Sequence, residues 1–427
     1  MGAVDGEDDE NRVIERQKSR FGWMHGTALI LLAAAVLLAP AALQRAGFRG
    51  FVVLYAIAAV AWIAILRRTP PLSRLAVMVI ALALRLPFLV VEPRLSGDVY
   101  RYLSDGRMLA GGVNPYTYTP SDPRINHPEI RSIYPPHAQL LFAAVHDLSG
   151  WRLLIVGVDL LALFLLRDRA LAYATSPLVI FEGVWSGHLD AIAAVLLLVA
   201  LTTATAWLRG AALALAGGLK IIPLAAAPLL ARGAHRKSVA AFFAVLVLPV
   251  IPFLGAPIMP GFRDYATRWI FNSPAYALVR ALVARVPAKE LWTDSPLRIE
   301  LWSDFVYRHL DPDFLTRALL AIAAIIGILL ARRVTTAVGV LLLCSPAIHP
   351  WYWLALVPAA LTERSRGWLA LALCAPASYL LYDGVSPLVV YAICYGLPAA
   401  ACVAGAVRLT RARWSARSRT SNPPARR

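Results

Sequence analysis

Long runs of apolar residues, separated by short polar segments, occupy most of this 427-residue chain. A helix needs about 20 mostly apolar residues to cross a hydrocarbon core about 30 Å thick. The clearest runs that reach or approach that length are 26–44, 51–66, 75–91, 239–258 and 386–407. Because the backbone must satisfy its own hydrogen bonds in lipid, such runs are expected to be helical. The sequence therefore predicts an all-α polytopic membrane protein.

Composition and charge exclude two other classes of protein. Hydrophobic residues make up 59% of the chain and charged residues 16%, whereas soluble proteins have roughly 45–50% and about 25%. The net charge of +17 would suit a nucleic-acid partner, but the basic residues lie in short clusters between apolar runs, as in cytoplasmic loops of membrane proteins. We therefore expect no nucleic-acid partner, and contacts with membrane lipids. These clusters are 67–74, 167–169, 232–237, 332–333, 364–366 and the arginine-rich tail.

Placing the basic clusters in the cytoplasm predicts the topology and the domains. Residues 1–23 form a polar cytoplasmic N-terminus, 24–407 a transmembrane domain of about 12–14 helices, and 408–427 a basic cytoplasmic tail. Two long loops, 93–136 and 259–313, then lie outside the cytoplasm. Between 171 and 231 either two or four crossings fit. We expect a multi-pass protein of the bacterial inner membrane, whose first helix is retained and not cleaved as a signal peptide.

The first external loop contains the most concentrated candidate chemistry. Asp98 and Asp105 are seven residues apart, about two helical turns, so they share one face if 98–110 is an interfacial helix. Arg101 and Arg107 lie near them on that helix. A carboxylate beside arginines suits a reaction in which a base takes a proton from a hydroxyl while cations hold a phosphate. The alternative is ordinary salt bridging in a solvated helix.

Ionisable residues inside apolar runs are the second signal, because such residues are costly in lipid and usually face a cavity or a partner. Glu182, His188 and Asp190 either face a bound substrate or form a structural pair at a turn. Lys220 either holds a donor phosphate or extends to a headgroup. His349 precedes aromatic residues that belong equally to a sugar platform or to the interfacial belt. Arg85 is a candidate partner for a buried carboxylate.

The second external loop contributes Tyr265, Trp269, Asn272, Trp292 and Trp302. Tyrosine and tryptophan have apolar faces and polar edges, which suit contact with an amphipathic substrate. They suit a loop that rests on the bilayer surface equally well.

Several motifs together resemble one enzyme superfamily. The first loop reads Asp98-Val-Tyr100-Arg101-Tyr, then Asp105-Gly-Arg107, Gly112-Val-Asn114-Pro-Tyr116 and Ile133-Tyr134-Pro-Pro. Later segments are Ser176-Pro-Leu-Val-Ile-Phe-Glu182-Gly, Gly187-His188-Leu-Asp190, Gly218-Leu-Lys220, Phe271-Asn272-Ser-Pro and His349-Pro-Trp-Tyr. This pattern resembles GT-C glycosyltransferases, and most of all the bacterial polyprenyl-phosphate-mannose-dependent α-mannosyltransferases. Ser104 and Ser176 depart from the residues common in relatives.

The resemblance implies a GT-C-like bundle that transfers a hexose, mannose above all, from a polyprenyl phosphate to a glycan or glycolipid outside the cytoplasm, with inversion. It assigns the general base to Asp98, with Asp105 as the second candidate. The residues expected to bind substrate are Tyr100, Arg101, Arg107, Asn114, Tyr116, Tyr134, Glu182, His188, Asp190, Lys220 and His349. No cofactor is implied; a divalent metal is compatible with the two acids but not demanded, since six oxygen ligands are not visible.

Two other functions compete with this one. A transporter or flippase for a lipid-linked saccharide would spread polar residues along a path through the membrane. Here the polar residues gather at one membrane face, which favours an enzyme. A ligase with a lipid diphosphate donor would lack the Asp98-to-Tyr116 pattern.

Overall fold

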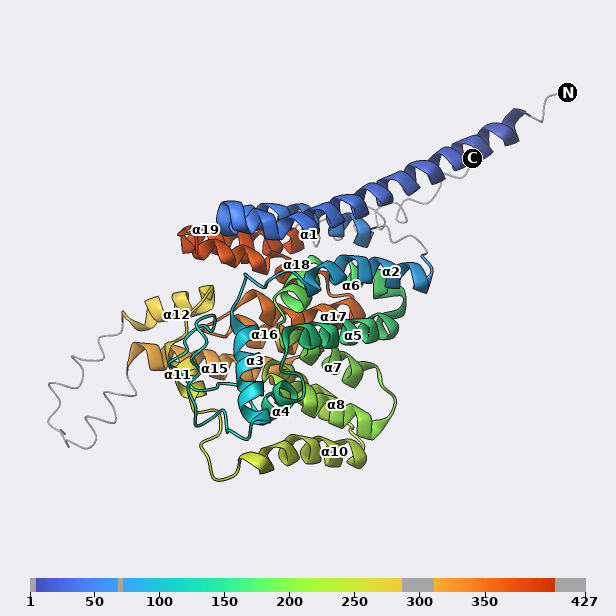
Figure 1. The fold of residues 1–427 in the computed structure, drawn as a ribbon. Coiled ribbons are helices and arrows are strands. Elements are labelled where there is room, and N and C mark those ends of the chain that lie inside the picture. Colours follow the sequence, from blue (N-terminus) through green and yellow to red (C-terminus); the bar gives the residue numbers. More distant parts are fainter. Residues whose placement is uncertain (1–4, 68–71, 286–310, 404–427) are drawn as a thin grey trace, which may run out of the picture.

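The computed structural model describes residues 5–67, 72–285 and 311–403, without the side chains of 5–25. Every element in these ranges is a helix, apart from one isolated parallel bridge between Phe271 and Ala347. The predicted all-α class is therefore confirmed (Figure 1). Trp292, Trp302 and the arginine-rich tail lie outside the described residues.

The N-terminal half contains α1 (Asp5–Arg67), α2 (Arg74–Arg85), η1 (Leu86–Leu89), α3 (Asp98–Ala110), α4 (Pro136–Ala144), α5 (Leu148–Leu166), η2 (Arg167–Arg169), α6 (Ala170–Ala174), η3 (Val179–Trp185), α7 (Asp190–Thr202) and α8 (Ala206–Leu219). The C-terminal half contains η4 (Ile222–Ala226), α9 (Ala227–Ala231), α10 (Arg236–Val247), η5 (Leu248–Phe253), α11 (Gly261–Arg268), α12 (Pro274–Val283), α15 (Pro312–Leu330), α16 (Val334–Leu343), η6 (Pro350–Ala355), α17 (Leu356–Thr362), α18 (Arg366–Cys374), η7 (Ala375–Leu381), α19 (Pro387–Tyr391) and η8 (Ala392–Gly396).

Helix α1 is interrupted where the sequence predicts the turn between its first two spans. Gly47 has a φ of +63°, a conformation that glycine adopts without the steric cost of a Cβ atom. Residues on both sides of this break line one apolar groove, 27–31 from the first arm and 56–64 from the second. The two arms therefore lie side by side (Figure 1). The carboxylate of Asp383 accepts a bond of 2.8 Å from the backbone N–H of Arg49 and fixes this turn.

Four helical stretches in the described part are long and apolar enough to cross a membrane: Gly26–Arg67, Leu148–Ala174, Arg236–Phe253 and Pro312–Leu330. A fifth is the bent pair Val179–Trp185 and Asp190–Thr202. Shorter apolar helices occupy most of the remaining predicted spans, among them Val334–Leu343, Arg366–Leu381 and Pro387–Val403. The helix at 98–110 is present as predicted. Its interfacial position and the total of 12–14 spans stay predictions.

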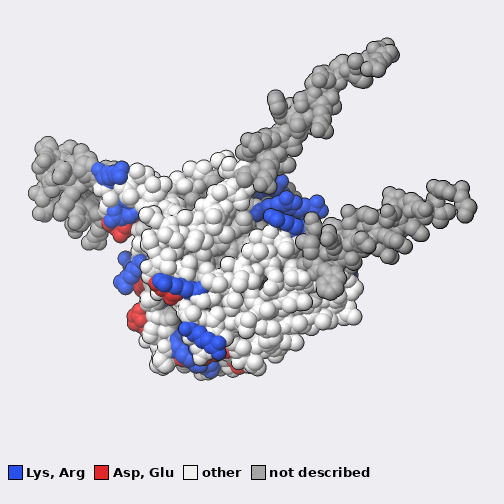
Figure 2. All heavy atoms as spheres, turned by 90° about the horizontal axis from the view of Figure 1, so that it is seen from above, with Lys and Arg blue, Asp and Glu red and all other residues white. Residues whose placement is uncertain are grey.

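Charged residues are distributed as an apolar belt requires. On the face shown in Figure 2 they lie at two opposite edges, and a broad uncharged band separates them. Basic segments far apart in sequence also meet: Arg232 donates to the carbonyl oxygen of Leu329. Likewise, Glu363 accepts from the backbone of Val334 at 2.8 Å. The clusters 232–237, 332–333 and 364–366 therefore lie together, as the predicted topology demands.

A break in the fifth span positions much of the site. The π-helix η3 and helix α7 meet at an angle of 115°, and Gly187 in the turn has a φ of +74°. The carbonyl oxygen of Gly187 accepts a hydrogen bond of 2.7 Å from the indole Nε1–H of Trp151. A Cβ atom on Gly187 would lie 3.0 Å from Cγ2 of Val99. The break therefore lies tightly against the start of α3.

The partner expected for Arg85 is Asp159. Nε of Arg85 lies 2.7 Å from Oδ2 of Asp159, and both side chains are buried. The hydroxyl of Tyr173 donates to the other carboxylate oxygen at 2.7 Å. A buried carboxylate needs such partners, and this triad joins α2, α5 and α6 away from α3.

Candidate active site

A cavity of about 680 Å³ opens between α3, α11 and the ends of several buried helices. It is within the range of 300–1,000 Å³ typical of small-molecule sites. Its walls combine charged, aromatic and aliphatic side chains. They are Phe48, Arg94, Leu95, Ser96, Gly97, Asp98, Arg101, Ile125, Asn126, His127, Ile130, Ile133, Tyr134, Lys220, Tyr265, Trp269, His349, Trp351, Tyr352 and Tyr382.

Asp98 is the first residue of α3 and faces this cavity. Its backbone N–H donates to the Ser96 hydroxyl at 3.2 Å, which fixes the start of the helix. The side chain is 23% exposed. Burial raises the pKa of Asp98 above its ordinary value, while Lys220, Ser96, Arg101 and Tyr134 oppose that rise. A carboxyl whose pKa is raised toward neutrality is a stronger base than an ordinary aspartate.

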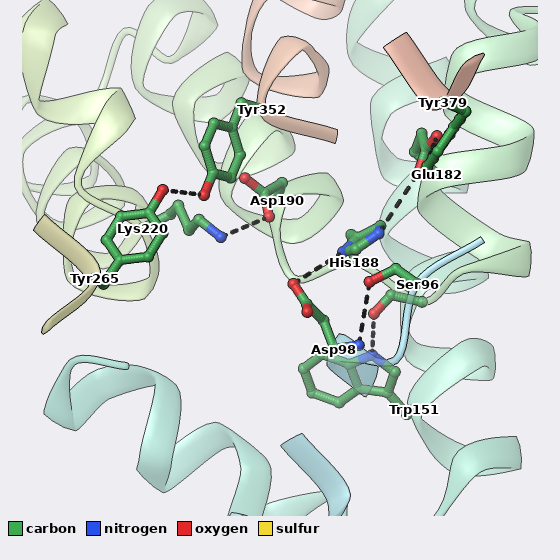
Figure 3. Close-up of polar contacts among 11 residues, drawn as sticks. Ser96, Asp98, Trp151, Glu182, His188, Asp190, Lys220, Tyr265, Tyr352 and Tyr379 are labelled. Atoms are coloured by element: carbon green, nitrogen blue, oxygen red, sulfur yellow. Dashed lines mark hydrogen bonds and ion pairs between the residues drawn. The ribbon is translucent and has the colours of Figure 1, made fainter. Parts of the chain in front are cut away.

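His188 lies behind Asp98 (Figure 3). Its Nδ1 is 3.9 Å from Oδ2 of Asp98, and its Nε2 is 3.5 Å from Oε2 of Glu182. The hydroxyl of Tyr379 donates to both oxygens of Glu182, at 3.0 and 3.1 Å. The predicted Glu182–His188 pair therefore exists, and it is joined to the predicted base.

Lys220 and Asp190 form the other charged pair of the site. Nζ of Lys220, at the end of α8, lies 3.0 Å from Oδ2 of Asp190, at the start of α7. The ammonium group is 5.0 Å from the centre of the Tyr352 ring and 5.6 Å from that of Tyr134. The hydroxyls of Tyr352 and Tyr265 are 2.5 Å apart. Lys220 is therefore held at the cavity wall against tyrosine rings, and Figure 3 shows it beside Tyr265 and Tyr352.

A column of flat rings forms another wall. His188 stacks on Trp351 at 4.1 Å, and Trp351 stacks on His349 at 4.4 Å. Phe271 continues the column against His349 at 4.5 Å and against Tyr382 at 5.4 Å. Such faces suit the C–H surfaces of a sugar or an isoprenoid chain.

Arg101 reaches the cavity, but its donors are used within the protein. The guanidinium group donates to the carbonyl oxygens of Ile130 at 2.9 Å, His127 at 2.7 Å and Asn126 at 3.3 Å. No carboxylate of the described residues lies within ion-pair distance of it. Arg101 therefore holds the loop that forms the cavity mouth.

Asp105 does not line the cavity. It is buried on α3, and Gln139 donates to it at 3.1 Å. Burial raises the pKa of this carboxyl, and hydrogen bonds from Ser132 and Gln139 oppose the rise. This position favours Asp98 over Asp105 as the residue that meets a substrate.

Four predicted binding residues of the first external loop lie outside the cavity lining, as do Glu182, His188 and Asp190. Tyr100 donates to Glu92 at 3.3 Å, and Arg107 to the carbonyl oxygen of His146 at 3.4 Å. The side chain of Asn114 accepts from the N–H of Tyr116 at 2.9 Å and closes a turn. The Tyr116 hydroxyl donates to the carbonyl oxygen of Tyr134 at 2.8 Å. Each therefore makes a structural contact within the protein.

Several site residues were not predicted from the sequence. Arg94, His127 and Tyr382 line the cavity, and Tyr379 anchors Glu182. The two tyrosines end an apolar run, where an interfacial belt is the ordinary explanation. The described residues contain no group of three or more acidic, histidine or cysteine side chains arranged to hold a metal ion.

The comparison with known protein families indicates a type of reaction. Residues 20–135 match the family described as alpha-(1->6)-mannopyranosyltransferase, N-terminal domain. This match supports a glycosyltransferase, and the long apolar helices support a membrane protein. The match covers about a quarter of the chain, includes Asp98, and confirms the resemblance inferred from the motifs. It ends before Lys220 and His349, which line the same cavity as Asp98, and before His188, which lies next to Asp98. No curated protein and no solved structure matched.

Proposed function

We propose that this protein is a mannosyltransferase that takes its sugar from a polyprenyl phosphate and passes it to the hydroxyl of a glycan or glycolipid on the extracytoplasmic side. The supporting observation is that Asp98, Lys220 and three rings of the aromatic column line one cavity; these rings are His349, Trp351 and Tyr382. A base, a cation and apolar faces are the three elements that such a transfer requires.

Asp98 is the base in this proposal. The acceptor hydroxyl gives its proton to the Asp98 carboxylate while its oxygen bonds to the anomeric carbon. The bond from that carbon to the phosphate oxygen breaks, and the polyprenyl phosphate leaves with the electron pair. Attack on the face opposite the phosphate inverts the anomeric centre. The raised pKa of Asp98 matches this role because it brings the base closer to working pH.

Lys220 is the residue that stabilises the leaving phosphate. Its half-buried ammonium group lies at the cavity wall, 3.0 Å from its counter-ion Asp190. A fixed cation in a water-poor cavity stabilises charge that develops on the phosphate more strongly than it would in water. The ammonium group lies over the rings of Tyr352 and Tyr134, and Lys220 lines the cavity.

The test is transfer of labelled mannose from polyprenyl-phosphate mannose in membranes containing the full chain. Asp98→Asn and Asp98→Ala are expected to lose about 100-fold or more of the transfer rate, as loss of a general base does. Glu129→Gln is the matched control in the same loop, because that carboxylate is 65% exposed and does not line the cavity.

Unchanged transfer by both Asp98 variants would exclude Asp98 as the base. No transfer from any lipid-linked sugar, together with movement of that lipid across vesicles, would instead support the flippase alternative. Labelled product must appear on the outer face of oriented vesicles; product on the cytoplasmic face would overturn the proposed side.

A further inference from the structure

We propose that His188 and Glu182 are positioning residues for Asp98, which orient its carboxylate toward the acceptor hydroxyl. This inference rests on the proposed function, in which Asp98 takes the acceptor's proton. It extends that function to two residues that lie beyond the part of the chain matched by the mannosyltransferase family.

The ring of His188 is fixed between the two carboxyl groups. It is fully buried, and it lies nearly parallel to the Trp351 indole, at 12°. One nitrogen therefore faces Asp98 and the other faces Glu182 (Figure 3). Within the described part of the chain neither ring nitrogen makes a hydrogen bond. Both are available to the carboxyl groups, whose distances shorten when a substrate closes such a site.

Glu182 is anchored on its far side. The Tyr379 hydroxyl holds both of its oxygens, and the side chain is fully buried. The break after η3 also matters, because the backbone N–H of His188 donates to the carbonyl oxygen of Glu182 at 3.1 Å. The contacts therefore form a line from the cavity inward: Asp98, His188, Glu182 and Tyr379.

The placement of protons follows from the chemistry of imidazole. A neutral ring has one N–H donor and one acceptor nitrogen. For Nδ1 to donate to the Asp98 carboxylate, Nε2 must accept a hydrogen bond, and a protonated Glu182 supplies that donor. The three groups then share one negative charge, which lies on Asp98 where the acceptor's proton arrives. A glutamine at 182 would supply the same kind of donor, whereas leucine would supply none.

Other groups also face Asp98 and act on its protonation. They are Lys220 at the end of α8, Arg101 on α3 itself, and the hydroxyls of Ser96 and Tyr134. Asp190 lies behind Lys220. All of them remain in place in variants of Glu182 and His188, so a change in the pH profile of those variants reports on the histidine contact.

The experiment compares Glu182→Gln with Glu182→Leu in the mannose-transfer assay across pH. We expect Glu182→Gln to stay within about threefold of the wild-type kcat and Glu182→Leu to lose at least about tenfold. The donor KM should stay unchanged in both. In Glu182→Leu the acid limb of kcat/KM should move to higher pH, because Asp98 loses a donor that stabilises its charged form.

Equal losses in the two variants with an unmoved acid limb would overturn the positioning role and leave only a structural one. Full activity of Glu182→Leu would overturn it as well. His188→Ala should move the acid limb in the same direction, and thermal unfolding of each purified variant identifies losses that come from misfolding. Asp98→Asn separates the two proposals. If that variant is active, the proposed base is wrong; if it is inactive while Glu182→Leu is normal, only the positioning role fails.

Discussion

The ammonium group of Lys220 lies 3.0 Å from the carboxylate of Asp190, although thirty residues and a helical hairpin separate them in the chain. The pair joins the end of α8 to the start of α7 at the cavity wall. Each charge compensates the other in a position where an isolated ion is costly. In the proposed function, the cation stays at the cavity until the phosphate of the donor arrives.

Replacing Lys220 should lower the rate of mannose transfer more than it lowers the stability of the fold, provided that its counter-ion Asp190 is also neutralised. Lys220→Met alone leaves Asp190 buried without its cation, which destabilises the fold. The double variant Lys220→Met with Asp190→Asn removes both charges. We expect it to fold and to lose about 100-fold in kcat, the typical loss for one donor that stabilises developing charge. Wild-type rates in the folded double variant would exclude Lys220 as the phosphate contact.

The transfer rate should depend on pH through Asp98. The base works only when deprotonated, and burial raises its pKa in the folded protein. The rate is therefore low at acidic pH, rises as the pH passes through the raised pKa and is constant above it. A profile of kcat/KM between about pH 4 and 9 tests this, because an ordinary aspartate, with a pKa of about 3.9, is almost fully deprotonated above about pH 5 and would give a flat profile from there on.

The same shift has a consequence for stability. A carboxyl whose pKa is raised on folding binds a proton more tightly in the folded than in the unfolded state, so stability falls as the pH rises through that interval. Asp98→Asn removes this penalty. We expect its unfolding temperature in detergent to equal or exceed that of the wild type at pH 7, while transfer is lost. A large fall in that temperature would show that the charged form of Asp98 stabilises the fold.

Gly106 permits the close approach of α3 to α4. A Cβ atom at this position would lie 2.1 Å from the carbonyl oxygen of Phe142, a backbone atom that cannot move aside alone. Gly106→Ala should therefore destabilise the protein by about 1–3 kcal/mol and displace Asp98 on the same helix. Gly157→Ala in α5 is the control, because its Cβ meets nothing within 4 Å. Equal unfolding temperatures for the two variants would contradict this packing.

The Arg85–Asp159 pair should matter for folding and not for chemistry. Arg85→Met leaves Asp159 buried with only the Tyr173 hydroxyl as a donor, and loss of one partner of such a pair costs about 3–5 kcal/mol. Arg85→Met combined with Asp159→Leu should recover part of that loss. Thermal unfolding measures both changes, and transfer per folded molecule should stay at the wild-type level. A specific loss of transfer would connect this pair to the site.

The sequence determined the class of protein and indicated Asp98, in the first long polar loop, as the main candidate carboxylate. Apolar length predicts the helices because lipid leaves the backbone no other partner, and the described helices follow those runs. The helix 98–110 and an internal partner for Arg85 were also predictable from local pattern. The motifs of the first loop sufficed for the mannosyltransferase resemblance, since they lie next to one another in the chain.

Only the tertiary structure decided how these residues are combined. Asp98 and Asp105 look equivalent by spacing, but one faces the cavity and the other binds Gln139. Arg101 looks like a phosphate ligand in the sequence, but its guanidinium group donates hydrogen bonds to backbone carbonyl oxygens of the loop. The approach of His188 to Asp98 depends on the 115° break between η3 and α7. Contacts between segments ninety or more residues apart depend on how the helices pack. The local periodicity of the sequence does not determine that packing.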